Sequence, residues 1–458
     1  MSEYESKRIR VLGADFFAPG DLDIGGKAAP EMFSEVFMAA GPWWPTHPLV
    51  ITDTDRRRLE ELSWRVTEMI LSAALRRART AGELCTALGY SEALTPMLDT
   101  EEPLGRHLLS SVRPDLVLEE GVPRVLEVNI DGAVGGAVPL DQMGASFVDM
   151  YKGSTTAAAD LSVTGYAVRR RFESIVEDLG LRPGHRLLVP AFSGGAIPGY
   201  EAAKRFAEAQ GYMVPIARSM GIDLVFVSVD DLGIDHEDRL LAEGSPVDGV
   251  LRLFLSADQA ETPGFTNLVR SVRAGRVGMF TSEAAWLLSN KHILHWLWED
   301  IDRLPRGEQD FIRSFVPRTL PLTSDWLRSD AGASAIRDRG EWVVKPAGGS
   351  GGEGVVIGGQ VDADAWRDAL ERGAGQDCVL QRKVAVDKVR VSFLHDLTRR
   401  TRNEEVPFLL GPLLFGGRGS GITARIGVPE SSEVLNVHQG ASIQSVLALR
   451  EHGPQPRG

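Results

Sequence analysis

The chain has 458 residues, which is too long for a single hydrophobic core and predicts two or three subdomains. Its hydrophobic fraction of 43% and charged fraction of 25% are ordinary for a globular protein and exclude wholesale disorder. The 63 acidic and 50 basic residues leave a net charge of −13, which argues against nucleic acid or an anionic membrane surface as a partner.

Two further features bear on the compartment. The cysteines Cys85 and Cys378 are far apart and lie outside any CxxC or Cys/His pattern, so neither a disulfide framework nor a zinc site is expected. The first residues contain no apolar signal region, and no run of about 18 apolar residues could span a bilayer. We therefore expect a soluble cytoplasmic protein, with a homodimer as the default oligomer of a soluble enzyme.

The first long periodic pattern runs from Asp55 to Ala81 and predicts one scaffold helix without a catalytic role. A β-hairpin is predicted next, between Arg113 and Gly136. Asp115 begins one of its strands, while Glu127 and Asn129 are two apart on the other, so their side chains point to the same face.

Oxygen ligands on one sheet face suit Mg²⁺, which uses one or two carboxylates together with substrate phosphates. An exposed face of an acidic hairpin is the alternative. Glu127 and Asn129, however, lie among Val, Leu and Ile residues, where a polar side chain needs a partner.

Strands and helices alternate between Gly165 and Gly275. Apolar strands are predicted at Arg186–Pro190, Met213–Ile216 and Leu224–Val229, with a helix at Tyr200–Gln210. This alternation predicts a parallel sheet, and therefore a Rossmann-like βαβ subdomain.

Three positions within and after this segment have two possible roles each. The loop Ser193–Gly199 follows a strand and opens a helix, where such sheets bind ligands, but an ordinary tight turn has the same pattern. Arg252 alternates out of an apolar strand, where it either points into a cleft or, as we expect, faces solvent. A helix is predicted over Thr281–Asp300, and Lys291 within it either extends to water or meets a buried anion.

A glycine-rich stretch, Trp342 to Val356, follows an apolar strand that ends at Lys345. Backbone N–H groups of such a loop, beside a lysine, can hold phosphates, whereas a flexible hairpin loop with a solvated lysine is the alternative. The loop residues that we assign to nucleotide binding are Gly348, Gly349, Ser350, Gly351 and Gly352.

Two later strands complete the candidate site. The strand Cys378–Lys383 offers backbone edges to a purine, and Leu380, next to Gln381, is expected to pack on the face of the ring; a plain sheet strand is the alternative. The segment Phe408–Val428 contains a glycine turn and then Arg425, whose guanidinium suits a phosphate or carboxylate.

These motifs together resemble a circularly permuted ATP-grasp ligase, of the type that includes the synthetase domain of glutathionylspermidine and trypanothione synthetases. The matching phrases are an arginine and an aspartate followed by Glu-x-Asn, a Ser-Asn-Lys phrase, Val-Val-Lys-Pro before the glycine loop, and a late Gly-Ile-x-x-Arg. The metal-ligand motif comes before the lysines, which is the order of the permuted enzymes.

The resemblance implies a role for each matching residue. Arg113 and Arg425 would act on the reacting phosphate, and ATP phosphates would be held by Lys291 and Lys345. Mg²⁺, as two ions, would be held by Asp115, Glu127 and Asn129.

The implied fold is an α/β, circularly permuted ATP-grasp fold with the Rossmann-like subdomain. Residues 1–164 would form an N-terminal helical region with the metal-binding hairpin, 165–275 the Rossmann-like part, and 276–458 the ATP-binding lid and the C-terminal part of the core. The implied activity is an ATP-dependent ligase that joins a small-molecule carboxylate to an amine through an acyl phosphate and releases ADP and phosphate. A carboxylate-thiol ligase that loads a carrier protein, or an ATP-binding protein without catalysis, are the alternatives.

Overall fold

The computed structural model describes residues 8–35, 42–191, 199–256, 261–349, 351–430 and 435–450. Among these residues the largest sheet has nine strands, which come from both ends of the sequence. Its main path is β1 (Trp43–Pro45), β17 (Lys388–His395), β18 (Thr401–Phe415), β19 (Arg418–Ile426), β20 (Ser442–Leu449) and β2 (Leu49–Thr52). Off this path, β3 (Ser111–Glu119) pairs with β18, β4 (Val122–Ile130) pairs with β3, and β5 (Leu161–Val163) pairs with β20.

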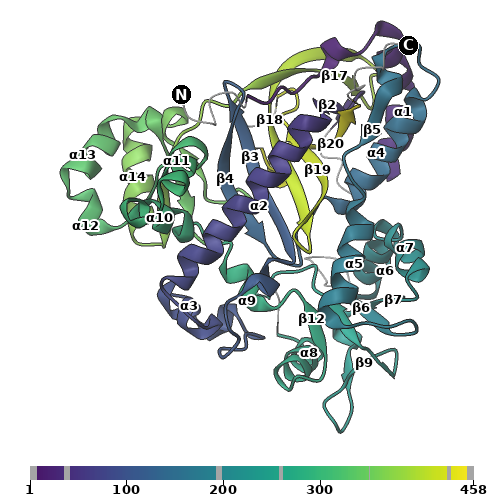
Figure 1. Ribbon diagram of the computed structural model, residues 1–458, viewed down its shortest axis with the longest axis vertical. Helices are drawn as coiled ribbons and strands as arrows, with labels where there is room; N and C mark the ends of the chain where they lie inside the picture. Colours follow the sequence, from purple (N-terminus) through teal and green to yellow (C-terminus); the bar gives the residue numbers. More distant parts are fainter. Residues whose placement is uncertain are drawn as a thin grey trace.

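Helix α2 (Asp53–Leu75) packs on the large sheet and lies across β3 and β18 (Figure 1). It was predicted as one helix from Asp55 to Ala81, which is wrong at its C-terminal end. Thr80 is extended and caps a separate helix, α3 (Ala81–Ala87), by accepting a hydrogen bond from the amide of Glu83 at 3.3 Å. Beside β20, α4 (Ala137–Tyr151) packs against α1 (Pro19–Glu35).

A second sheet is parallel throughout, as the alternation of strands and helices predicted. Its order is β12 (Gly278–Phe280), β11 (Gly249–Leu251), β6 (Arg186–Ala191) and β7 (Asp223–Ser228), and the helices α5 (Ala167–Leu179), α6 (Gly199–Ala209), α7 (Met213–Ser219) and α8 (Pro263–Arg273) accompany it. Three short antiparallel strands, β8 (Gly233–Ile234), β9 (Leu240–Ala242) and β10 (Ser245–Pro246), form a separate sheet.

One strand prediction in this region is wrong. Met213–Ile216 belongs to helix α7, whose buried residues Met213 and Ala217 are four apart and pack in the core of the parallel sheet. A short apolar run has no period long enough to distinguish a strand from a buried helix turn.

A third sheet is antiparallel, with the order β13 (Thr319–Leu322), β16 (Cys378–Arg382), β14 (Trp342–Pro346) and β15 (Val356–Ile357). Helices α12 (Ser324–Leu327), α13 (Asp330–Arg337) and α14 (Ala363–Ala374) cover one of its faces. In Figure 1 these helices stand at the opposite side of the molecule from α5, α6 and α7. Trp366 is fully buried in the core beneath them and donates its indole N–H to the carbonyl of Ala335 at 3.1 Å.

The single helix predicted over Thr281–Asp300 is in fact two helices, α9 (Glu283–Leu287) and α10 (His292–Glu299). Asn290 produces the break, because its side-chain oxygen accepts a hydrogen bond from the amide of His292 at 2.8 Å. Lys291 is left at the N-terminal end of α10, which is followed by α11 (Arg306–Phe315).

No helix in the described ranges combines the length and the apolar character that crossing a bilayer requires. The subdomain boundaries near residues 164 and 275 stay predictions.

Candidate active site

The β3–β4 hairpin carries the predicted metal ligands. Asp115 lies directly opposite Glu127 in the strand pairing, and Arg113 lies opposite Asn129. The pairing register shifts between Asp115 and Leu116, so the ladder is irregular next to the acidic pair. The hairpin therefore places both carboxylates and the amide together, as the sequence predicted.

The tip of this hairpin is held by a residue from another segment of the chain. Glu120 and Gly121 both have positive φ angles, of 51° and 80°, which is the backbone of a tight two-residue turn. Their amides donate to the two carboxylate oxygens of Asp387 at 2.9 and 2.7 Å. Asp387 follows the third sheet in the chain, so the tip of the hairpin is tied to the segment between β16 and β17.

Asp115 sits between two guanidinium groups. Nε of Arg113 lies 3.1 Å from one carboxylate oxygen, and Nη2 of Arg425 lies 2.6 Å from the other. Asp115 is 2% exposed and Arg425 is 9% exposed. Burial lowers the pKa of Arg113, while the adjacent Asp115 opposes that effect. The two catalytic arginines predicted from sequence are thus brought onto one carboxylate.

Glu127 faces the two predicted nucleotide lysines. Its carboxylate lies 3.2 Å from Nζ of Lys291. Burial acts to raise the pKa of Glu127, but the ammonium groups of Lys291 and Lys345 hold it well below its usual range, so the carboxylate is ionised at neutral pH. Burial also lowers the pKa of Lys345, from 10.5 to about 8.

Gln381 connects Lys345 to the hairpin. Its side-chain oxygen accepts a hydrogen bond from Nζ of Lys345 at 2.7 Å. Its amide nitrogen donates to the carbonyl of Leu126 at 3.2 Å and to the hydroxyl of Thr319 at 3.1 Å. Because Gln381 is 1% exposed, these bonds fix the third sheet against β4 at the level of Glu127.

The glycine loop is held by Lys291 from the other side. The backbone amide of Lys291 donates to the carbonyl of Ala347 at 2.9 Å, and its ammonium donates to the carbonyl of Gly349 at 2.8 Å. A Cβ atom at Gly348 would come within 2.3 Å of the hydroxyl of Tyr90, so the loop approaches Tyr90 as closely as glycine permits. Ser350, also assigned to nucleotide binding, lies outside the described residues.

Two cavities meet at these residues. The smaller, of about 350 Å³, lies between the large and third sheets; Lys345, Gly352 and Gln381 line it together with apolar side chains, among them Val343, Ile357 and Leu409. The larger, of about 660 Å³, is lined by Arg113, Asn129, Lys291, Gly348, Gly349 and Gly351. Glu127 and Arg425 line both cavities.

Two sequence predictions need correction and one falls outside the structure. Leu380 lines neither cavity; its side chain packs with Val344 and Trp366, because adjacent residues of a strand point to opposite faces and Gln381 takes the cavity side. Arg252 does not face solvent: it is 1% exposed and forms an ion pair with Asp131. Of the loop Ser193–Gly199, residues 193–198 lie outside the described residues.

The larger cavity also contains aromatic residues that sequence reasoning missed. Tyr90 and Trp286 stack with ring centroids 4.9 Å apart, and both line it. Tyr90 accepts a hydrogen bond from the side-chain amide of Asn290 at 2.8 Å. The Ser-Asn-Lys phrase was the available signal, since Asn290 precedes Lys291, but nothing in the sequence linked it to Tyr90.

The donor set fits Mg²⁺. Two carboxylates and an amide supply hard oxygen atoms, and Mg²⁺ commonly takes one or two carboxylates besides phosphate oxygens. The amide nitrogen of Asn129 donates to the carbonyl of Arg113 at 3.1 Å, which leaves its oxygen available to the cavity. Among the described residues no three Asp, Glu, His or Cys side chains are grouped so that they could hold a metal ion.

Comparison with solved structures places the fold. A glutathione synthetase-like effector from Globodera pallida, in its apo form, superposes with a TM-score of 0.58 at 13% sequence identity, over 95% of this chain and 99% of that chain. The fold is of the ATP-grasp type. The circular permutation stays a prediction.

Two other solved structures are similar at lower scores. A putative gamma-glutamylcysteine synthetase from Methylobacillus flagellatus has a TM-score of 0.41 at 11% identity, over 73% of this chain and 80% of that chain. A D-alanyl-alanine synthetase A from Vibrio cholerae has a TM-score of 0.29 at 15% identity, over 49% and 68%. No protein-family model and no curated protein matches the sequence.

Proposed function

We propose that the protein is an ATP-dependent ligase that joins a small-molecule carboxylate to an amine and releases ADP and phosphate. The observation that carries this proposal is the meeting of the two cavities at Glu127 and Arg425, with Lys291 paired to Glu127 at 3.2 Å and Lys345 lining the smaller cavity beside it. One cavity is partly apolar and suits a nucleotide base, and the other is large enough for a second substrate. The fold shared with a synthetase-like protein is consistent with it.

ATP would occupy the smaller cavity, with its base against Val343, Ile357 and Leu409 and its phosphates toward Lys345. Phosphoryl transfer asks the protein for positioning and for neutralisation of charge rather than for covalent chemistry. The candidate site has this character, because its central side chains are lysines, arginines and carboxylates. Mg²⁺ held by Asp115, Glu127 and Asn129 would supply further positive charge to the phosphates.

The carboxylate substrate would lie in the larger cavity, where Arg113 and Arg425 can neutralise charge near Glu127. An oxygen of this carboxylate forms a bond to the γ-phosphorus as the bond to ADP breaks, which gives an acyl phosphate. The amine then attacks the acyl carbon, and phosphate leaves with the electron pair of the broken C–O bond. The loop that contains Gly348 and Gly349 would keep water from the acyl phosphate.

The proposal is tested by incubating the purified protein with ATP, Mg²⁺ and pools of carboxylic acids and amines. We expect ADP and phosphate to form only when an acid is present, and hydroxylamine to trap the acyl phosphate as a hydroxamate. The variant Glu127→Gln, which keeps the shape of the side chain but removes its charge, should lower turnover by at least about a hundredfold. Its thermal unfolding curve serves as the control for folding.

Other outcomes would indicate a different function. Formation of AMP would contradict a ligase of this type. Product formation with phosphopantetheine thiols in place of amines would make the protein a carboxylate-thiol ligase with a carrier protein as its partner. ATP binding without turnover in any pool would make it a nucleotide-binding protein.

A further inference from the structure

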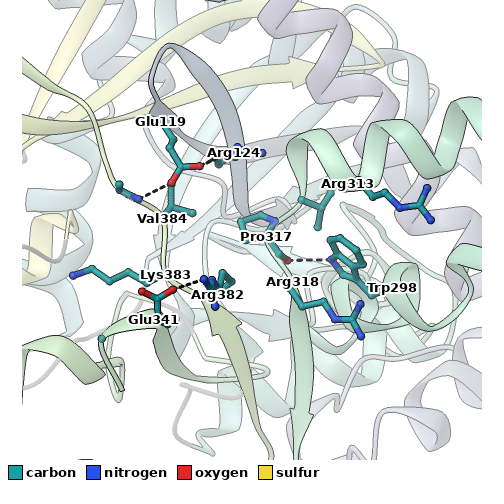
Figure 2. Close-up of a pocket in the computed structure, with 13 residues that line it drawn as sticks. Glu119, Arg124, Trp298, Arg313, Pro317, Arg318, Glu341, Arg382, Lys383 and Val384 are labelled. Carbon is teal, nitrogen blue, oxygen red and sulfur yellow. Dashed lines mark hydrogen bonds and ion pairs between the residues drawn. The ribbon is translucent and has the colours of Figure 1, made fainter. Parts of the chain in front are cut away.

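A third cavity lies beside the nucleotide cavity and is not used by the proposed reaction. It has a volume of about 650 Å³ and lies between the hairpin, the end of α11 and the third sheet. The linker segment, residues Arg382–Ala385 at the end of β16, lines both this cavity and the smaller cavity described above. We call the new space the linker cavity (Figure 2).

The linker cavity is rich in positive charge. Arg124 pairs with Glu119 at 2.9 Å, and Arg382 pairs with Glu341. The basic side chains that line the cavity without a carboxylate partner, within the part of the chain that the structure describes, are Arg313, Arg318 and Lys383. This excess of three cations stands out in a protein whose net charge is −13.

Figure 2 shows how these groups are distributed. Arg313 and Arg318 lie on the side of Trp298, and Lys383 extends on the opposite side, with the two ion pairs between them. The guanidinium carbon of Arg318 lies 5.0 Å from the centroid of the Trp298 ring. All three side chains are exposed, and in Figure 2 Arg313 and Lys383 extend away from each other, so the uncompensated cations stand at opposite rims of the cavity.

The cavity also contains the contacts that hold the linker segment. The amide of Ala385 donates to the Glu119 carboxylate at 3.0 Å, the amide of Lys383 to the carbonyl of Glu341 at 2.8 Å, and the amide of Arg382 to the carbonyl of Arg318 at 2.7 Å. These bonds hold the backbone of the linker segment in place, while Arg313, Arg318 and Lys383 are exposed side chains at the rims.

We propose that the linker cavity binds a small polyanion that carries phosphate groups, at a site separate from the nucleotide cavity. Guanidinium groups form paired hydrogen bonds with phosphate oxygens, and a ligand that carries several phosphates can reach the basic side chains on both sides of the cavity. The volume is close to that of the larger cavity assigned to the substrate, so a metabolite of ordinary size fits.

Inorganic triphosphate is the probe, with binding measured by isothermal titration calorimetry in buffer without Mg²⁺. The full-length protein should bind two equivalents, and one equivalent should remain when a non-hydrolysable ATP analogue saturates the nucleotide cavity. The double variant Arg313→Gln/Arg318→Gln should weaken the remaining binding by at least about tenfold, since a hydrogen bond to a charged group contributes about that much.

Two further variants make the assignment unambiguous. Lys345→Met removes a lysine of the nucleotide cavity and, in titrations without the ATP analogue, should lose one of the two equivalents of bound triphosphate and keep the other. Arg367→Gln removes an arginine of α14 that is 53% exposed and does not line the linker cavity, and it should leave the analogue-resistant binding unchanged. The proposal is overturned if the ATP analogue displaces all bound triphosphate, or if Lys345→Met abolishes binding that Arg313→Gln/Arg318→Gln leaves intact.

Discussion

Arg425 and Asp115 are 310 positions apart in the chain, yet Nη2 of Arg425 donates to Oδ2 of Asp115 at 2.6 Å in the interior of the protein. Arg113 binds the other oxygen of the same carboxylate. One buried carboxylate thus pairs with two arginines, Arg425 buried and Arg113 half-buried, so that Asp115 has two partners in this set and each arginine has one carboxylate that it shares.

This inequality predicts that Asp115 matters more to stability than Arg425 does. Asp115→Asn leaves two guanidinium groups without their carboxylate and should lower the free energy of unfolding by about 3–5 kcal/mol. Arg425→Gln leaves Asp115 paired with Arg113 and should cost clearly less. Urea unfolding followed by circular dichroism, without Mg²⁺, measures both. Equal losses in the two variants would show that the carboxylate is not shared in this way.

The pKa of Lys345 predicts how nucleotide affinity depends on pH. Burial lowers this pKa to about 8, so the ammonium is present at pH 7 and is lost as the pH rises past that value. If the ammonium holds the phosphates, the Kd for ATP should be constant below about pH 7.5 and rise by up to about tenfold per unit above pH 8. Fluorescence titration with a labelled ATP analogue checks this.

A control variant separates the titration of Lys345 from the titration of other groups that affect ATP binding. Lys345→Met should bind the analogue weakly at every pH and show no inflection near pH 8. The same lowered pKa affects stability with the opposite sign: the unfolded chain binds more protons between about pH 8 and 10.5, so this group's contribution to stability rises across that window. An unchanged inflection in Lys345→Met would assign the titration to another group.

Gln381→Leu should damage both stability and nucleotide binding. The substitution removes three hydrogen bonds, those with Lys345, Leu126 and Thr319, and leaves the half-buried Lys345 ammonium without its amide partner. We expect a loss of about 2–4 kcal/mol in the free energy of unfolding and weaker ATP binding. Thr319→Val, which removes only the hydroxyl, is the matched control and should lose about 1 kcal/mol with unchanged ATP affinity.

The close approach of Gly348 to Tyr90 predicts that a defect caused by one substitution can be relieved by a second. Gly348→Ala would bring a methyl group within 2.3 Å of the Tyr90 hydroxyl, so the glycine loop must shift and the rate of ADP formation should fall by about tenfold or more. Tyr90→Phe in the same chain removes the clashing oxygen, and the next nearest atom is at 3.2 Å. The double variant should therefore regain most of the lost rate. Failure of this rescue would place the defect elsewhere in the loop.

Local chemistry made part of the site predictable. Asp115, Glu127 and Asn129 were predicted to lie together because strand periodicity and a short turn fix their positions without any knowledge of the rest of the fold. Lys291 and Lys345 were joined to them only through the resemblance to permuted ATP-grasp ligases. The linker cavity had no sequence signal, since its basic residues come from separate segments that meet only through tertiary packing.

The errors also have physical causes. Arg252 was expected in solvent because alternation in a strand shows which residues share a face but not whether another element covers that face. Leu380 and Gln381 were both assigned to the nucleotide, although neighbours in a strand must diverge. The helix break at Asn290 depends on one side-chain hydrogen bond. The apolar residues before and after Asn290 keep a helical spacing, so the sequence pattern gave no sign of the break.

The large sheet is built from strands near both ends of the sequence, so it can be completed only late in synthesis. Strands β3 and β4 are made early, but their partner β18 begins at Thr401, and β19, with Arg425, follows it. A ribosome that has released only the first 400 residues has therefore supplied every strand of the parallel sheet and of the third sheet, while one edge of the hairpin still lacks its neighbour. Until the last 58 of the 458 residues emerge, Asp115 lacks Arg425 as its second arginine, and the nascent protein presents an unpaired β-strand to other chains.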